Sequence, residues 1–300
     1  MAALVSITAC SNSKIEITKG NKSTNSIQAL KEPEAKETEQ AVEETEVIAT
    51  NTLEEINERD KIVIGVKTDY TPFGFIDSDG DNAGLEVDIA RRITEEVLDS
   101  EEKVEFVPVT ALNRIELLKQ GKIDLVIATM TDTEERRQEI DFSENYYSSG
   151  VGLLTKKGNG IETWEDLEGK TVCGIEGAFY HEELTEMKVE MLNFPQTSAA
   201  YKSLKEGLCV GFAYDELGLV EKIQDPDWSN WHQPLEPILK KSWGMGVRKG
   251  NEQFLTMVND AILEMEAEGF IVEGEKKWNI PSTEYAEERR SKAKAKVDSN

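Results

Sequence analysis

Residues 121–147 read GKIDLVIATMTDTEERRQEIDFSENYY, an apolar run that passes into a charged segment. The apolar part, residues 123–128, is short enough to predict a buried strand. Residues 104–109 before it have a strand-like pattern, and residues 112–119 between the two have a helical one. A strand, a helix and a strand at this spacing predict a βαβ unit and a mostly parallel sheet.

The same alternation extends to both sides of this stretch. Residues 61–66, KIVIGV, predict a strand that ends in a turn cluster, and apolar residues every fourth position over 85–98 predict a helix. After Gly150 the pattern restarts, and a terminal helix is predicted around 254–265. The restarted pattern has strands at 171–175 and 209–214 and helices at 181–188 and 198–206. We therefore expect two α/β lobes, with ligands bound at the carboxyl ends of strands.

Composition excludes several classes of function. The 34 Lys and Arg against 59 Asp and Glu give a formal charge of −25, which repels nucleic acid and anionic lipid surfaces. No apolar run approaches the roughly 18 residues of a membrane helix. Two histidines and three widely spaced cysteines provide little material for a zinc site or a CxxC motif. We expect no metal and no cofactor.

The first ten residues, MAALVSITAC, end in a motif typical of a bacterial lipobox, whose cysteine would be acylated. The alternative is a buried first strand, but the polar residues that follow do not continue a strand pattern. A secretory signal begins with a basic region, and no Lys or Arg precedes Cys10. We therefore expect residues 1–10 to be a truncated lipoprotein signal with its lipid anchor at Cys10.

Two further segments are expected to lie outside the lobes. Residues 31–60 carry eleven acidic and three basic residues, a net charge of −8. Such a segment cannot bury enough surface to fold, so residues 11–57 are predicted to be a disordered tether, compatible with a short solvated helix over 53–59. Residues 281–300 are predicted to be a charged tail that forms a frayed helix or is disordered.

Five blocks and a closing KKW at 276–278 resemble the solute-binding proteins of polar amino-acid ABC transporters. The blocks are GVKTDYTPFGF (65–75), AGLEVDIARRI (83–93), the long stretch at 121–147, WEDLEGKTV (164–172) and LKEGLCVGFAYDE (204–216). The resemblance runs from about residue 61 to 278. It implies the two-lobed, type II periplasmic-binding-protein fold, with two crossover hinge strands. The implied parts are 58–146 plus 244–280 for lobe 1, 151–238 for lobe 2, and 147–150 and 239–243 for the hinge.

The resemblance also implies a ligand site with no catalytic residues. Arg136 falls at the family's carboxylate clamp, with Thr129 and Thr131 as neighbours, and a bidentate guanidinium suits an α-carboxylate. Asp215, which follows Tyr214, holds the position that receives the α-ammonium, and Tyr70 that of an aromatic wall. In lobe 2, Gly177-Ala178-Phe179 replaces the hydroxyl-bearing residues frequent in the family, which narrows the pocket and puts the exact ligand in doubt.

Lys67 and Arg114 stand where glutamate and aspartate binders of the family carry cations, so the best expectation is an acidic amino acid. The alternatives are a solvent-facing strand end for Lys67 and a surface residue pairing with Glu116 or Glu135 for Arg114. A binder of glutamine or another polar amino acid also stays open. So does a dehydratase-like enzyme, for which Glu176 is the one candidate acid or base.

The implied partners are a free L-amino acid and a membrane permease, and the implied address is extracytoplasmic, with the membrane reached only through the lipid anchor. We expect a monomer. Cys173 and Cys209 lie in strands that are neighbours in the family's sheet, so a disulfide between them is attainable. The equal alternative is two buried reduced cysteines.

Overall fold

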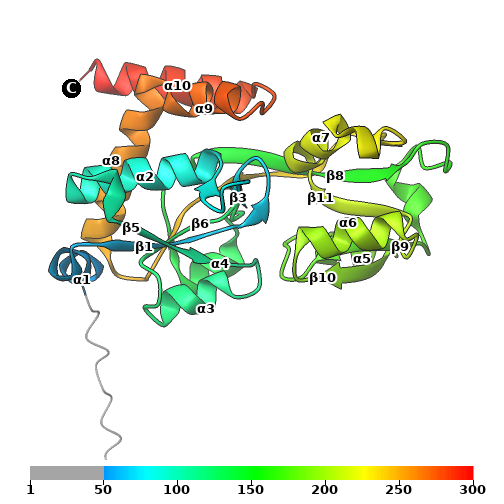
Figure 1. Cartoon of the computed structure of the whole chain (residues 1–300), viewed down its shortest axis with the longest axis horizontal. Coiled ribbons are helices and arrows are strands. Elements are labelled where there is room, and N and C mark those ends of the chain that lie inside the picture. Colours follow the sequence, from blue (N-terminus) through cyan, green and yellow to red (C-terminus); the bar gives the residue numbers. More distant parts are fainter. Residues whose placement is uncertain (1–50, 300) are drawn as a thin grey trace, which may run out of the picture. The chain divides into compact units, whose positions relative to one another are not determined.

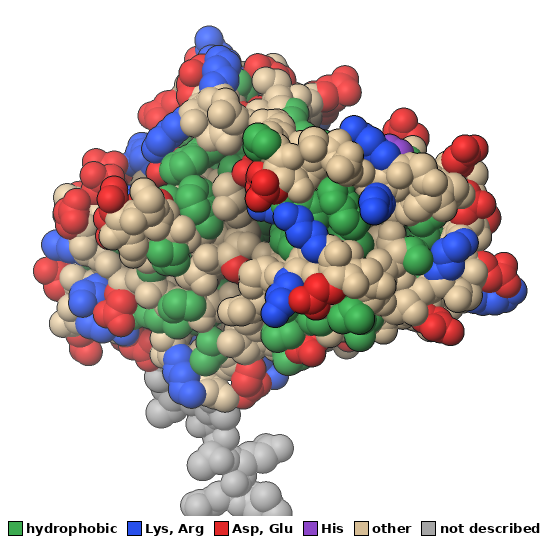
Figure 2. All heavy atoms as spheres, turned by 45° about the vertical axis from the view of Figure 1, so that its right-hand side comes forward, with side chains coloured by type: hydrophobic (Ala, Val, Ile, Leu, Met, Phe, Trp, Pro, Cys, Tyr) green, Lys and Arg blue, Asp and Glu red, His purple; other side chains and the backbone are tan. Residues whose placement is uncertain are grey.

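The structure is a computed structural model that describes residues 51–299, which lie in one compact unit, residues 48–300. The expected signal at 1–10, the anchor Cys10 and the tether up to residue 50 lie outside the described residues. No helix within 51–299 combines the length and the apolar character needed to cross a bilayer. On the face seen in Figure 2, acidic and basic side chains are intermixed with hydrophobic ones.

The first lobe is built on a five-stranded sheet in the order β5-β1-β6-β14-β7. Strand β1 is parallel to β5 and β6, as the βαβ pattern predicts, and β14 is antiparallel to both β6 and β7. Helices α2 and α8 lie on one side of this sheet and α3 on the other (Figure 1). The elements are α1 (Thr52–Arg59), β1 (Ile62–Val66), α2 (Leu85–Leu98), β5 (Val104–Pro108), α3 (Arg114–Lys119), β6 (Leu125–Ile127), α4 (Glu134–Glu139), β7 (Asp141–Phe142), β14 (Gly246–Val247), α8 (Glu252–Glu268), α9 (Phe270–Lys277) and α10 (Glu284–Val297), with a small sheet of β2 (Asp69–Tyr70), β3 (Gly74–Ile76) and β4 (Asn82–Ala83) beside them.

The second lobe is built on a sheet in the order β10-β9-β11-β8-β12, with β13 also paired to β8. Strand β9 is parallel to both of its neighbours, whereas β8 is antiparallel to its partners. The elements are β8 (Tyr147–Lys156), β9 (Thr171–Ile175), α5 (His181–Glu186), β10 (Glu190–Phe194), α6 (Thr197–Lys205), β11 (Gly211–Asp215), α7 (Glu216–Gln224), β12 (Trp231–His232) and β13 (Ile238–Trp243).

Two strands connect the lobes. The chain passes from the first sheet to the second along β8 and returns along β13, and the two strands pair antiparallel with Trp243 opposite Tyr147. Figure 1 shows β8 running from one lobe into the other. The two-lobed α/β fold with two crossover strands, expected from the sequence, is confirmed.

The structure corrects the expectation for both ends of the lobes. Helix α1 begins inside the expected tether, because Ile56 is buried and Asn251 Oδ1 accepts the backbone N–H of Thr52 at 2.8 Å. The expected tail at 281–300 contains helix α10, which packs on α8 with Ala286 and Ala293 buried. Net charge alone did not reveal these anchoring contacts.

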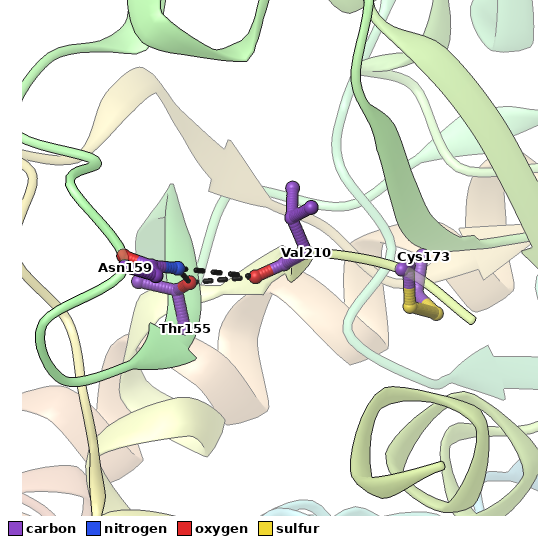
Figure 3. The surroundings of a disulfide bond; sticks show 5 residues. Thr155, Asn159, Cys173 and Val210 are labelled. Carbon is purple, nitrogen blue, oxygen red and sulfur yellow. Dashed lines mark hydrogen bonds between the residues drawn. A yellow bond between two sulfur atoms is a disulfide. The ribbon is translucent and has the colours of Figure 1, made fainter. Parts of the chain in front are cut away.

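A disulfide joins Cys173 in β9 to Cys209, just before β11, with 5.6 Å between the Cα atoms. The prediction of this bridge is confirmed, and the alternative of two reduced cysteines is not what the structure contains. Beside the bridge, Thr155 Oγ1 donates a hydrogen bond to the Val210 carbonyl at 2.6 Å, and Asn159 donates to Thr155 (Figure 3). The backbone directly after Cys209 is therefore held in place.

Candidate ligand site between the lobes

A small cavity of about 30 Å³ lies between the two lobes. The structure brings together nine of the ten predicted ligand residues around it, and Tyr70 is the exception. The lining residues are Lys67, Ala111, Arg114, Thr129, Thr131, Arg136, Ile175, Ala178, Phe179, Tyr180, Tyr214 and Asp215. A space of this size holds about two or three water molecules, so an amino acid requires the lobes or the lining side chains to move apart.

Strand ends place these side chains together, as the topology rule predicts. Lys67 directly follows β1, Thr129 follows β6 by two residues, Ala178 follows β9, and Asp215 ends β11. The parallel strands of the two sheets thus direct their carboxyl ends at the same cavity. Ala111, Ile175 and Tyr180 also line the cavity and were not predicted, because none of them belongs to a motif that indicates ligand binding.

Lys67 is buried, not exposed at a strand end. Its Nζ donates a hydrogen bond to Tyr214 Oη of the other lobe at 3.1 Å and lies 3.8 Å from a carboxylate oxygen of Asp69. Burial lowers the pKa of Lys67, while the charge of Asp69 raises it. Lys67 therefore already has an anionic partner within its own lobe.

Arg114 is also buried, so its expected alternative as a surface residue is wrong. Its Nη1 donates to the carbonyl of Ala128, whereas its Nε has no hydrogen-bond partner within 51–299. Burial lowers the pKa of Arg114 to about 9, with a smaller contribution from the charge of Arg136. The guanidinium remains charged at neutral pH.

Arg136 lies in α4 and reaches across to the second lobe. Its Nη1 donates to the Thr131 carbonyl at 2.8 Å, and its Nη2 donates to the Gly177 carbonyl at 3.1 Å. Burial lowers the pKa of Arg136, and the charges of Glu135 and Asp215 raise it. The guanidinium is thus held by backbone oxygens from both lobes.

Asp215 ends β11 and is buried in the opposite wall of the cavity. Burial raises the pKa of Asp215 to about 7, although the positive charges of Lys67 and Arg114 lower it. Neither Asp215, Arg114 nor Arg136 takes part in an ion pair with any residue in 51–299.

Tyr70 packs behind the cavity and does not line it. Its ring lies 4.9 Å from that of Tyr214 and 5.3 Å from that of Phe73, measured between centroids. Lys67 Nζ lies 5.5 Å from the centroid of Tyr70. Tyr70, expected as an aromatic wall, therefore packs against two lining residues, Lys67 and Tyr214, and is not itself part of the lining.

The loop at 177–179 closes the cavity from the second lobe. Gly177 has φ +74°, and a Cβ built there would meet the backbone of Ala111 at 3.1 Å. Phe179 lies beneath Lys241, whose Nζ is 5.4 Å from the ring centroid. Glu176, the candidate acid or base of an enzyme, does not line the cavity.

Sequence reasoning missed Glu86, the second residue of α2. Its side chain is fully buried, and its Oε1 accepts the backbone N–H of Thr129 at 2.6 Å together with the hydroxyl of Tyr146. Burial raises the pKa of Glu86 to about 7, and these hydrogen bonds lower it. The missed signal is an acid at helical spacing from Ala90 and Ile93, on the apolar face of the predicted helix.

The sequence is similar to those of known bacterial binding proteins. The family model of the bacterial extracellular solute-binding proteins, family 3, matches residues 62–281. An ABC transporter glutamine-binding protein of Bacillus subtilis is 35% identical over 76% of this chain and 84% of its own. A glutamine-binding protein of Geobacillus stearothermophilus is 34% identical over 85% and 92%. A glutamate/aspartate import solute-binding protein of Salmonella typhimurium is 29% identical over 77% and 80%.

Solved structures show the same two-lobed arrangement. A solute receptor for L-cysteine of Neisseria gonorrhoeae matches with a TM-score of 0.73 and 30% identity, covering 77% of this chain and 94% of its own. An ancestral arginine-binding protein bound to glutamine matches with a TM-score of 0.68 and 33% identity, covering 73% and 97%.

Proposed function

Since the chain belongs to the bacterial extracellular solute-binding proteins of family 3, we propose that it captures a free acidic L-amino acid between its lobes for an ABC importer. A membrane permease then receives the ligand from the closed protein. The relatives with curated names support the transport role, because they are binding proteins of amino-acid importers. The charges around the cavity support the choice of ligand.

One observation supports the choice of an acidic ligand. Two guanidinium groups and one carboxylate, those of Arg114, Arg136 and Asp215, line the cavity and have no ion-pair partner within 51–299. Two cations and one anion are the complement of two carboxylates and one ammonium, which are the charges of glutamate and aspartate. Lys67 does not alter this balance, because Asp69 is its partner.

Each charged group then has a distinct role. Arg136 binds the α-carboxylate, because its two Nη atoms already lie between the lobes, and Asp215 receives the α-ammonium. Arg114 binds the carboxylate of the ligand's side chain, beside Lys67, which lines the same cavity and is paired with Asp69. Thr129 and Thr131 are placed to add hydrogen bonds, and Tyr214 with Ala178 and Phe179 forms the apolar part of the wall.

Glutamine is the second candidate, and the names of two relatives favour it. A glutamine would leave one of the two guanidinium groups facing a neutral amide, and an unmatched buried charge is costly. The enzyme hypothesis has lost its one candidate residue, since Glu176 lies outside the cavity lining.

Calorimetric titration of the full chain with the twenty L-amino acids tests the proposal. Glutamate or aspartate should bind at least about tenfold more tightly than glutamine, about 1.4 kcal/mol. Glutamine binding equally tightly would overturn the acidic ligand and leave amino-acid capture in place. No binding by any amino acid would overturn the whole proposal.

We also propose that the protein is extracytoplasmic and anchored by a lipid on Cys10. The disulfide supports an extracytoplasmic location, because such bridges persist in oxidising compartments. With a basic leader restored ahead of residue 1, metabolic labelling with a fatty acid in a bacterial host should mark the chain and not its Cys10→Ser variant. Equal labelling of the two would contradict the anchor.

A further inference from the structure

Glu86 lies beneath the cavity and does not line it. Both hydrogen bonds to it are made by Oε1, which accepts from the Thr129 backbone and from Tyr146 Oη. Its other oxygen, Oε2, is buried and has no hydrogen-bond partner in the part of the chain that the structure describes. The proposed function does not use this carboxylate, and the fold buries it at a cost.

The residues that Glu86 holds are those that hold both arginines. Thr129 has φ +46°, a left-handed conformation that residues other than glycine adopt at a cost of about 1–2 kcal/mol. On either side of it, the carbonyl of Ala128 accepts from Arg114 and that of Thr131 accepts from Arg136. One short backbone segment, residues 128–131, thus orients the two guanidinium groups, and the hydrogen bond to Glu86 fixes that segment at its bend.

We propose that Glu86 is a positioning residue that fixes segment 128–131, and with it both arginines, and whose buried charge sets the preference between acidic and amide-bearing amino acids. The second part rests on the proposed function. The first part concerns the protein without ligand and can be tested separately.

The charge argument follows from the groups around Glu86. Those that interact with it are Lys67, Tyr70, Arg114, Tyr146 and Asp215. An ionised Glu86 opposes a second carboxylate placed on Arg114, while it affects a neutral amide little. Because burial raises the pKa of Glu86 to about 7, the preference for glutamate over glutamine should fall as pH rises through that value. Asp215 titrates in the same range but contacts the ammonium that both ligands share, so its effect cancels in the ratio of the two affinities.

The positioning role is tested without ligand by proton–nitrogen NMR spectra of the full chain. The Thr129 amide proton should resonate far downfield in the wild type, because it is bonded to a carboxylate, and should lose that shift in Glu86→Ala. The shift should persist largely in Glu86→Gln, whose amide oxygen can still accept. An unchanged Thr129 resonance in Glu86→Ala would overturn the positioning role, whatever the protein binds.

The positioning role also predicts that glycine at position 129 compensates for the loss of Glu86. Glu86→Ala should weaken the binding of glutamate and glutamine alike by at least about tenfold, since both need Arg136. In a Thr129→Gly background, where positive φ is readily adopted, Glu86→Ala should weaken ligand binding clearly less. An equal cost in both backgrounds would contradict the role of the left-handed bend. If Glu86→Ala does not fold, the glutamine variant below decides.

The charge role is tested by the ratio of glutamate to glutamine affinity in Glu86→Gln. At pH 8 this ratio should exceed that of the wild type by about tenfold, and at pH 5.5 the two proteins should agree, because Glu86 is then protonated. Glu95→Gln is the matched control, since it removes an exposed charge from the same helix. A ratio in Glu86→Gln equal to that of Glu95→Gln at pH 8 would overturn the charge role. If neither ligand binds the wild type, the proposed function fails, and the ligand-free spectra still decide the positioning role.

Discussion

At the scale of single residues, the site depends on charges that the protein buries without pairing. Arg136 is half-buried, backbone carbonyls from both lobes hold it, and no carboxylate in 51–299 forms an ion pair with it. Its neighbour Arg137 is exposed and forms an ion pair with Asp132. The two adjacent arginines of one helix therefore provide a matched pair for mutagenesis.

Arg136→Ala should weaken ligand binding by about 2–5 kcal/mol, because it leaves the ligand's α-carboxylate desolvated and unpaired. Arg137→Ala should change the affinity little, since exposed ion pairs contribute about 0–1 kcal/mol. Calorimetry gives both affinities, and thermal unfolding shows whether each variant is folded. A folded Arg136→Ala protein that binds like the wild type would refute the carboxylate assignment.

Asp215 should make binding depend on pH. Its raised pKa of about 7 means that the ligand-free group is largely protonated below that pH, while the ligand's ammonium requires the carboxylate. Affinity should therefore fall as pH decreases below about 7, by at most about tenfold per unit. The Glu86→Gln background is the cleanest for this measurement, because the other group near pH 7 is then removed.

The same shift has an effect on stability of defined sign. A carboxyl whose pKa is raised by folding contributes stability at low pH that is lost as pH rises to the folded value. Asp215→Asn should therefore gain stability relative to the wild type between about pH 4 and 7. Thermal unfolding at several pH values checks this. If the stability difference between Asp215→Asn and the wild type narrows from pH 4 to 7, Asp215 is ionised in the ligand-free protein.

At the scale of elements, loop 177–179 is where backbone geometry and the contact between lobes coincide. Gly177 has a positive φ and lies against Ala111 of the first lobe. Gly158 has a similar φ of +78°, but a Cβ added there would meet no atom within 4 Å. The two glycines thus separate conformational strain from the contact between lobes.

Gly177→Ala should lower both stability and ligand affinity, while Gly158→Ala should lower stability alone. Both substitutions should lower the free energy of unfolding by about 1–2 kcal/mol, the cost of placing a residue other than glycine in the left-handed conformation. Only Gly177→Ala also pushes the lobes apart. Thermal unfolding and calorimetry on both variants provide the comparison, and equal affinities would show that the loop does not limit closure.

How far the sequence could predict the molecule also becomes clear at this scale. Helix α2 and strand β9 have strong periodic patterns, so they were predicted close to their observed bounds. The packing of helix α10 was not predicted, because the helix is anchored by two small residues, Ala286 and Ala293, and by the Thr283 hydroxyl bonded to Glu275. Small residues give no amphipathic signal, and their burial depends on helix α8, which is distant in the sequence.

The candidate site shows the same division. The motifs predict Lys67, Arg114, Arg136 and Asp215 as ligand residues, and the structure places all four around one cavity. Glu86 was not found, since its importance comes from a hydrogen bond to a residue 43 positions away. Sequence patterns identify side chains that face a ligand more readily than those that hold the backbone beneath them.

At the scale of the whole molecule, contacts at several places join the lobes around the cavity. Besides the bonds of Lys67 and Arg136, Thr197 at the start of α6 donates its backbone N–H to an Asp69 carboxylate oxygen at 2.8 Å. Its Oγ1 also donates to the Asp69 carbonyl at 2.6 Å. These bonds exist only while the lobes are together, so they add to the free energy of closure.

Thr197→Val should therefore bias the protein toward an open arrangement. The isosteric side chain removes the hydroxyl donor, and the affinity should fall by about three- to tenfold, the equivalent of one hydrogen bond. Ser198→Ala is the control, because Ser198 is the exposed next residue of α6. Small-angle scattering of the full chain should show a larger ligand-dependent compaction in Thr197→Val than in the control. No difference in either measurement would mean that this contact does not contribute to closure.

The size of the cavity has a consequence for the rate of capture. With about 30 Å³ between the lobes, an amino acid cannot enter the molecule in this arrangement, so each capture must wait for an opening. At low ligand concentration the rate of capture rises in proportion to supply. At high concentration it levels off at the frequency with which the lobes separate. In a medium rich in ligand, the opening rate of this chain therefore sets an upper limit on the rate of import.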